Sequence, residues 1–233
     1  MVKKLLFFIL LFSFSSQSQN IERENLFSYK IEKNIHIYVE KSNKAYRDQD
    51  FKEAEALFEY FINQVVNNSY MDNFKVKKLS GRTIELYDFE KPIFLMTYAS
   101  WCTPGVGEIP ALNEIVQENY KNIDFVILFW DSKENVKKVA RDYDSKINLL
   151  YVDETENKHN YVIETMKHSL GFPTSFFIDE NKKIIDVRRG VLHPYNEEYA
   201  ISYELNYNAF LNGISLLKNF SSIQEGLVTQ KNP

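Results

Sequence analysis

The stretch that decides the fold is residues 99–110, Ala-Ser-Trp-Cys-Thr-Pro-Gly-Val-Gly-Glu-Ile-Pro. It follows directly on an apolar run, residues 92–98, of the kind that forms a buried central strand. Cys102 therefore comes where a buried strand ends and a helix is predicted to begin. Unpaired backbone N–H groups and the positive end of a helix dipole favour thiolate over thiol at such a place. The pattern predicts a nucleophilic Cys102 that titrates below about 8.5.

Two prolines and a glycine shape the predicted turn and helix. Pro104 suits a first helical turn, where its missing N–H is not needed, whereas Pro110 would remove a later hydrogen bond and kink the helix. Cys102 is the only cysteine in the chain, so no intramolecular disulfide can form. Since free cysteines are often inert core residues, a buried structural role for Cys102 is the alternative.

The rest of the chain alternates strand and helix patterns. A hairpin is predicted around the turn at residues 80–82, and two strands at residues 174–179 and 183–188 should pair antiparallel. Further strands are expected at 92–98, 124–130 and 147–152, and helices at 104–120, 133–143, 158–169 and 197–220. This order predicts an α/β fold, a mixed sheet covered by helices on both faces.

The sequence divides into four parts. Residues 1–18 carry Lys3 and Lys4 near their start, continue as a short apolar run and end in small and polar residues, which predicts a signal peptide cleaved after Ser18. An uncleaved anchor or a buried amphipathic start is the alternative. Residues 19–70 carry apolar positions at helical spacing and predict a two-helix extension packed on the main domain. Residues 71–220 form the predicted α/β domain, and residues 221–233 a frayed tail. We therefore expect an exported protein without a stable membrane anchor after cleavage.

Charge and histidine spacing exclude other classes. The formal net charge of -4 offers no broad basic face for a phosphate backbone, so nucleic-acid binding is not expected. The histidines show no metal-ligand spacing with Cys102 or with one another, and no metal or other cofactor is predicted. A peroxiredoxin would need Thr or Ser three residues before the cysteine, where Ala99 stands.

Two motifs resemble the TlpA and ResA-like exported thiol-disulfide oxidoreductases, which have a thioredoxin fold. Residues 99–110 are similar to that family's active-site pattern W-C-x-P-C-x-x-E-x-P, and Gly105 stands in place of the second cysteine. Residues 170–179 resemble the family's G-x-P-T-x-x-x-I-D stretch. The resemblance covers about residues 72–220. The pattern is matched at Trp101, Cys102, Pro104, Glu108 and Pro110.

The resemblance implies roles for individual residues. Glu108 would be an active-site acid that handles protons, although a surface glutamate in a first helical turn is the alternative. The Phe172–Pro173 bond would be cis and would offer a backbone edge to a substrate beside Trp101; a trans proline that opens a strand is the alternative. Gly190 matches a glycine at the rim of the site.

Without a second cysteine, the resemblance implies monothiol chemistry in the bacterial periplasm. Cys102 could attack a protein or small-molecule disulfide, but an external thiol would have to resolve the mixed disulfide. The alternative is a redox-inactive thioredoxin-fold module that binds a partner protein. Gly105 and Gly107 near the predicted helix start favour this alternative slightly, since each weakens a helix by about 1 kcal/mol.

Overall fold

The computed structural model of this 233-residue chain describes residues 21–99, 101–152, 165–166, 170–190 and 197–230, with side chains described as far as residue 220. The predicted signal peptide lies outside these residues. So do most of the helix predicted at 158–169 and three of the four histidines, His159, His168 and His193. Within the described residues, no helix is long and apolar enough to cross a membrane.

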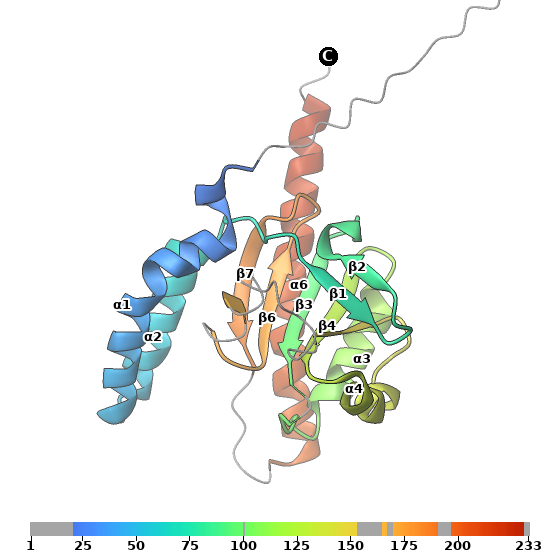
Figure 1. The fold of residues 1–233 in the computed structure, drawn as a ribbon, viewed down its shortest axis with the longest axis horizontal. Coiled ribbons are helices and arrows are strands. Elements are labelled where there is room, and N and C mark those ends of the chain that lie inside the picture. The colour runs from blue at the N-terminus through green and yellow to red at the C-terminus, as the bar shows by residue number, and fades with distance from the viewer. Residues whose placement is uncertain (1–20, 100, 153–164, 167–169, 191–196, 231–233) are drawn as a thin grey trace, which may run out of the picture.

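One mixed sheet forms the centre of the molecule (Figure 1). In the described part of the chain it has seven strands in the order β2-β1-β5-β4-β3-β6-β7. Strands β3, β4 and β5 run parallel, and the other neighbours pair antiparallel. The bounds are β1 (Lys75–Lys78), β2 (Thr83–Glu85), β3 (Ile93–Tyr98), β4 (Asp124–Trp130), β5 (Asn148–Val152), β6 (Thr174–Ile178) and β7 (Ile184–Arg189). The predicted α/β fold and both predicted hairpins are confirmed.

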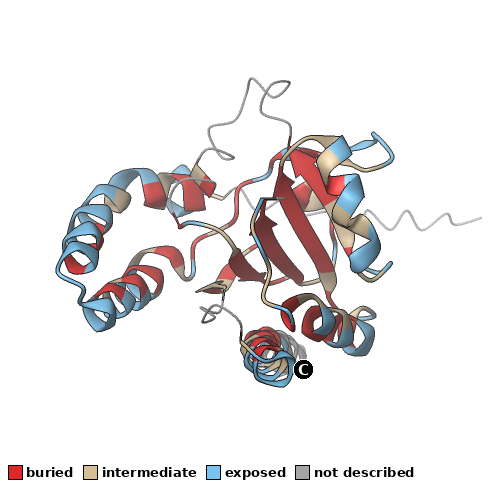
Figure 2. Ribbon diagram, turned by 90° about the horizontal axis from the view of Figure 1, so that it is seen from below, coloured by how far each residue is buried: buried red, intermediate tan, exposed pale blue. Residues whose placement is uncertain are grey.

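The two faces of the sheet belong to two separate hydrophobic clusters. All six residues of β3 are buried, because helices cover both faces. Its alternate side chains divide between the faces, with Ile93 and Leu95 in one cluster and Phe94 and Met96 in the other. The buried strands and the surrounding exposed helix surfaces are visible in Figure 2.

Three helices cover the face that carries Phe94. They are α3 (Glu108–Asn119), α4 (Lys133–Val139) and α6 (Tyr199–Gln230), and each adds buried side chains to that cluster. Helix α6 continues beyond Phe220, where the sequence analysis ends it, through residues that were expected to fray. Residues 221–230 contain no proline, and the single Gly226 weakens the helix by about 1 kcal/mol without ending it.

The predicted N-terminal helices pack on the other face. Helix α1 (Phe27–Arg47) and helix α2 (Phe51–Phe61) form a hairpin, and α2 continues as the short η2 (Ile62–Val66). Asp50 is the N-cap of α2, and its side chain accepts a hydrogen bond from the Glu53 N–H at 3.0 Å. Phe27 meets Phe176 of β6 edge to face at 5.5 Å. The hairpin therefore shares its core with the sheet.

Candidate active site

Cys102 lies in an irregular loop between β3 and α3. Its backbone N–H donates to the Ala99 carbonyl at 2.9 Å, and helix α3 begins only at Glu108. The prediction that the helix starts at Pro104 is therefore wrong, and Cys102 does not occupy a helix N-terminus. Pro110 is the third residue of α3, where no intrahelical N–H bond is lost, so the predicted kink is also absent.

Packing against α6 explains the late start of α3. Gly107 is the N-cap of α3, and its N–H donates to the buried Ser202 hydroxyl at 3.0 Å. A Cβ built on Gly107 would lie 2.1 Å from the Tyr203 backbone nitrogen. Glycine is therefore required where the two helices approach, and the resulting contact anchors the first turn of α3 at Glu108.

Glu108 points into the molecule beside this loop. It is only 8% exposed, and its Oε2 accepts a hydrogen bond from the Gly105 N–H at 3.3 Å. Burial raises the pKa of Glu108 to about 7, against a smaller opposing effect of the Gly105 hydrogen bond. The alternative of a surface glutamate is excluded, and the carboxyl can exchange a proton near neutral pH.

The Cys102 thiol is half-buried, in contact with the cluster under α3 and α6. Burial raises the pKa of Cys102, and the negative charge of Glu108 adds to the effect. A backbone hydrogen bond with Ala99 opposes them without reversing the direction. The prediction of a lowered pKa is thus wrong, because the expected helix dipole is not in place and desolvation dominates.

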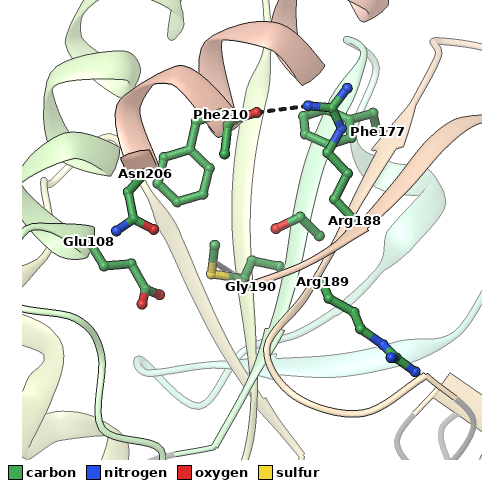
Figure 3. Close-up of a pocket in the computed structure, with 10 residues that line it drawn as sticks. Glu108, Phe177, Arg188, Arg189, Gly190, Asn206 and Phe210 are labelled. Carbon is green, nitrogen blue, oxygen red and sulfur yellow. Dashed lines mark hydrogen bonds between the residues drawn. The ribbon is translucent and has the colours of Figure 1, made fainter. Parts of the chain in front are cut away.

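A small cavity of about 20 Å³ adjoins the Glu108 side chain (Figure 3). This is room for about one water molecule. Asn206 of α6 and Arg188 of β7 line it together with Met96 of β3. Among the described residues that line this cavity, Glu108 is the one with a carboxyl group.

The side chains of Trp101 and Phe172 are in contact, as expected for two residues of one substrate edge. Trp101 is 72% exposed, and its ring meets the Phe172 ring at 6.2 Å and 72°. The Phe172–Pro173 peptide bond is cis. Gly190 donates its N–H to the Pro173 carbonyl at 2.9 Å, and a Cβ on Gly190 would lie 2.4 Å from Pro173 Cγ. Gly190 is therefore a close-packing glycine at this rim.

Several residues of the site were not predicted from the sequence. Tyr98 is buried and Tyr143 is half-buried near the thiol and carboxyl. Desolvation raises the pKa of both phenols, with a further contribution from the charge of Glu108. Ser202 and Asn206 come from α6, and Ser202 bonds Gly107 across 95 positions of sequence. No local motif marks these residues, because only the packing of α6 brings them to the loop.

We expect Glu108→Gln to stabilise the fold at pH 8 and to flatten its pH dependence. Because the pKa of Glu108 is raised from its ordinary 4.5 to about 7, the folded state holds a proton that the unfolded state loses between those values. The wild-type free energy of unfolding should therefore fall by up to about 3 kcal/mol as pH rises through this window. Urea unfolding at pH 5 and pH 8 measures it.

The exposed Glu134 of α4 supplies the control for that experiment. Glu134→Gln should leave the pH dependence of the wild type unchanged. If Glu108→Gln behaves like Glu134→Gln, the Glu108 carboxyl is not desolvated in the folded protein.

The sequence of this chain is similar to those of known thioredoxin-like proteins. The model of the AhpC/TSA family matches residues 68–187, which is more than half of the chain. A thiol-disulfide oxidoreductase ResA of Bacillus thuringiensis is 34% identical over 122 residues, an alignment that spans 51% of this chain and 66% of the relative. The thioredoxin-like protein YneN of Bacillus subtilis is 26% identical over 133 residues, covering 57% of this chain and 76% of the relative.

Solved structures include a similar domain. The thioredoxin domain of a thiol-disulfide oxidoreductase from Bacteroides vulgatus matches with a TM-score of 0.49 and 20% identity, over 64% of this chain and 98% of that domain. The ResA alignment falls just short of two thirds of that relative's length. On the family match, the chain belongs to the AhpC/TSA family of thioredoxin-fold proteins, and its sequence is similar to those of the ResA thiol-disulfide oxidoreductases.

Proposed function

We propose that this protein is an exported monothiol oxidoreductase in which Cys102 exchanges with disulfides of protein or small-molecule substrates. Glu108 is the proton donor and acceptor of the exchange. Trp101, Phe172 and Pro173 form the edge that receives the substrate. Pro104, Gly105 and Pro110 shape the loop that holds the thiol. No metal or other cofactor takes part in this chemistry.

The observation that carries the proposal is the pairing of a half-buried thiol with a buried carboxyl of near-neutral pKa. Glu108 bonds the N–H of Gly105, the residue that replaces the second cysteine of the family pattern. At pH 7 the Cys102 thiol is mostly protonated, so a base must accept its proton before attack. A carboxyl that is close to half ionised at that pH suits this task.

The proposed exchange has two steps, attack on the substrate disulfide and resolution by an external thiol. The Cys102 proton passes to the Glu108 carboxylate, and the thiolate attacks one sulfur of the substrate disulfide. The substrate S–S bond breaks, a mixed disulfide forms on Cys102, and the leaving thiolate takes a proton from Glu108. An external thiolate then attacks the substrate sulfur of the mixed disulfide. This step releases the Cys102 thiolate and leaves a disulfide between the substrate and the external thiol.

Export is part of this proposal. It is supported by the basic start, apolar run and small residues of positions 1–18, and disulfide exchange is common in oxidising compartments such as the bacterial periplasm. N-terminal sequencing of the protein from its native compartment tests it. A mature chain that begins at Gln19 supports export by cleavage after Ser18, whereas one that begins at Met1 contradicts it.

The second candidate function is a redox-inactive binding module. The raised pKa of Cys102 favours it, because a thiol that is protonated at neutral pH exchanges slowly without a base. The late start of α3 points the same way, since the helix dipole does not assist the thiolate. The two candidates differ in whether Cys102 ever forms a mixed disulfide.

Mixed-disulfide trapping on Cys102 separates the two candidates. The purified protein is incubated with glutathione disulfide from pH 6 to 9, quenched with acid and analysed by mass spectrometry, with Cys102→Ser as the blank. We expect a glutathione adduct on Cys102 that added glutathione removes, and a lower rate at pH 7 for Glu108→Gln. A folded protein whose Cys102 forms no adduct at any pH would leave only the binding module.

A further inference from the structure

A groove of about 750 Å³ separates helix α2 from strand β7. This volume lies within the range of about 300–1,000 Å³ that is usual for ligand sites. One wall carries the α2 side chains of Phe51, Glu55 and Glu59, and the other wall is β7 from Asp186 onward. The groove reaches Gly190, whose N–H bonds the Pro173 carbonyl, so it ends beside the candidate active site.

Strand β7 is an edge of the sheet, and part of its backbone faces the groove. Gly190 directs its N–H toward β6, so by strand alternation Arg188 also faces β6 while Val187 and Arg189 face outward. The chain at residues 68–69 already pairs with Ile184 at the start of β7. Among the described residues, neither the Val187 carbonyl nor the Arg189 N–H has a hydrogen-bond partner on that outer side. An extended chain could bond to both.

The groove presents negative charge. Glu55 and Glu59 lie one helical turn apart on the exposed side of α2, and the described residues place no ion-pair partner beside either. Of the two arginines of β7, Arg188 is paired with a carboxylate and does not offset this charge. Arg188 turns to the opposite face of the sheet. There its Nε donates to the Asp186 carboxylate at 2.7 Å, and its Nη1 donates to the Ala209 carbonyl at 3.1 Å (Figure 3).

Arg189 is half-exposed at the groove and bonds to neutral groups there. Its guanidinium stacks on the Phe58 ring at 4.1 Å and donates to the Tyr46 hydroxyl and to the Leu170 carbonyl, each at 3.3 Å. None of these partners neutralises the guanidinium, but Glu55 and Glu59 outnumber it, so the groove keeps a net negative charge. Aromatic surface accompanies them, because Phe51 is 65% exposed at the same wall.

We propose that this groove binds an extended segment of a partner protein that alternates basic and aliphatic residues and adds to β7 as a further strand. Its backbone would bond to Val187 and Arg189, as in other cases of strand addition at a sheet edge. Its Lys or Arg side chains would point toward α2, where they would meet Glu55 and Glu59 and cover Phe51 with their stems. Its aliphatic side chains alternate with them along the strand and would lie on the opposite side. Binding of this kind needs no thiol chemistry, so the proposal goes beyond the proposed function.

A cysteine-free peptide, acetyl-Lys-Val-Lys-Leu-Lys-Val-amide with a fluorescent label, is the probe. Its binding to the full mature chain is measured by fluorescence anisotropy. We expect the double variant Glu55→Lys/Glu59→Lys to weaken binding at least about tenfold, and binding to weaken as salt increases. The matched control is Glu134→Lys/Glu204→Lys, which makes the same charge change at exposed sites outside the groove and should bind like wild type.

Two further measurements test strand addition itself. The same peptide with proline at its central leucine position loses one backbone donor and should bind at least about tenfold more weakly if the segment pairs with β7. Hydrogen exchange should show slower exchange of the Arg189 amide when the original peptide is bound.

Circular dichroism confirms that the variants remain folded. No binding of the peptide, equal losses in the two charge-reversal variants, or binding that tolerates proline without protection of Arg189 would each overturn the proposal. Because the peptide has no cysteine, none of these results depends on whether Cys102 is active.

Discussion

Replacing Gly105 with cysteine is expected to raise the rate of insulin reduction by dithiothreitol at least about tenfold over wild type, because the mixed disulfide would then be resolved within one molecule. Two residues separate Cys102 from position 105, which is the spacing of the C-x-x-C loop, and Pro104 stands between them. Cys102→Ser should abolish the activity of both backgrounds.

The structure supports a side chain at position 105. Among the described glycines, the left-handed backbone that disfavours side chains occurs at Gly81 and Gly171, so Gly105 has no such restriction. The Gly105 N–H that bonds Glu108 is retained in the variant, and the carboxyl stays beside the new thiol. The proton acceptor of the exchange is therefore still in place.

Val106→Cys is the matched control for this gain of function. It adds one cysteine at the neighbouring position, which is 60% exposed, but with three residues between the thiols. We expect a much smaller gain from it. Mass spectrometry of the oxidised variants shows whether Gly105→Cys loses two hydrogens. If it remains folded, forms no internal disulfide and gains no activity, the loop has lost its redox geometry and the binding module replaces the oxidoreductase.

The second large effect concerns stability. We expect Gly107→Ala to lower the free energy of unfolding by about 2–3 kcal/mol or more. The added methyl group would lie 2.1 Å from the Tyr203 nitrogen and 2.7 Å from the Ser202 carbonyl carbon. Both atoms are backbone of α6 and cannot rotate away, so α6 must shift and the bond from Gly107 to the Ser202 hydroxyl is strained.

Urea unfolding monitored by circular dichroism measures this loss. Gly105→Ala is the control, because it makes the same chemical change two residues earlier in the half-buried loop, outside the α3–α6 contact. It should cost well under half as much. Equal denaturation midpoints for the two variants would mean that α3 and α6 do not approach as closely as the structure has them.

The sequence by itself determined the order of the described strands and of the helices between them, and it marked the cysteine loop and the proline stretch of the candidate site. Period-two and continuous apolar runs mark β3 and β4, and the turn at residues 80–82 marks the first hairpin. These signals are local, since each is read within a window shorter than one element. The cysteine motif and the proline stretch at residues 170–179 are likewise continuous in the chain.

Only the tertiary structure decided how the site behaves. The start of α3, the burial of Glu108 and the direction of the Cys102 pKa shift all depend on α6, which lies far along the sequence. Helix propensity and the dipole rule consider the loop alone, and they predicted a helix start at Pro104 and an acidic thiol. Desolvation depends instead on every atom that packs around a group, so it could not be predicted before α6 was placed against the loop.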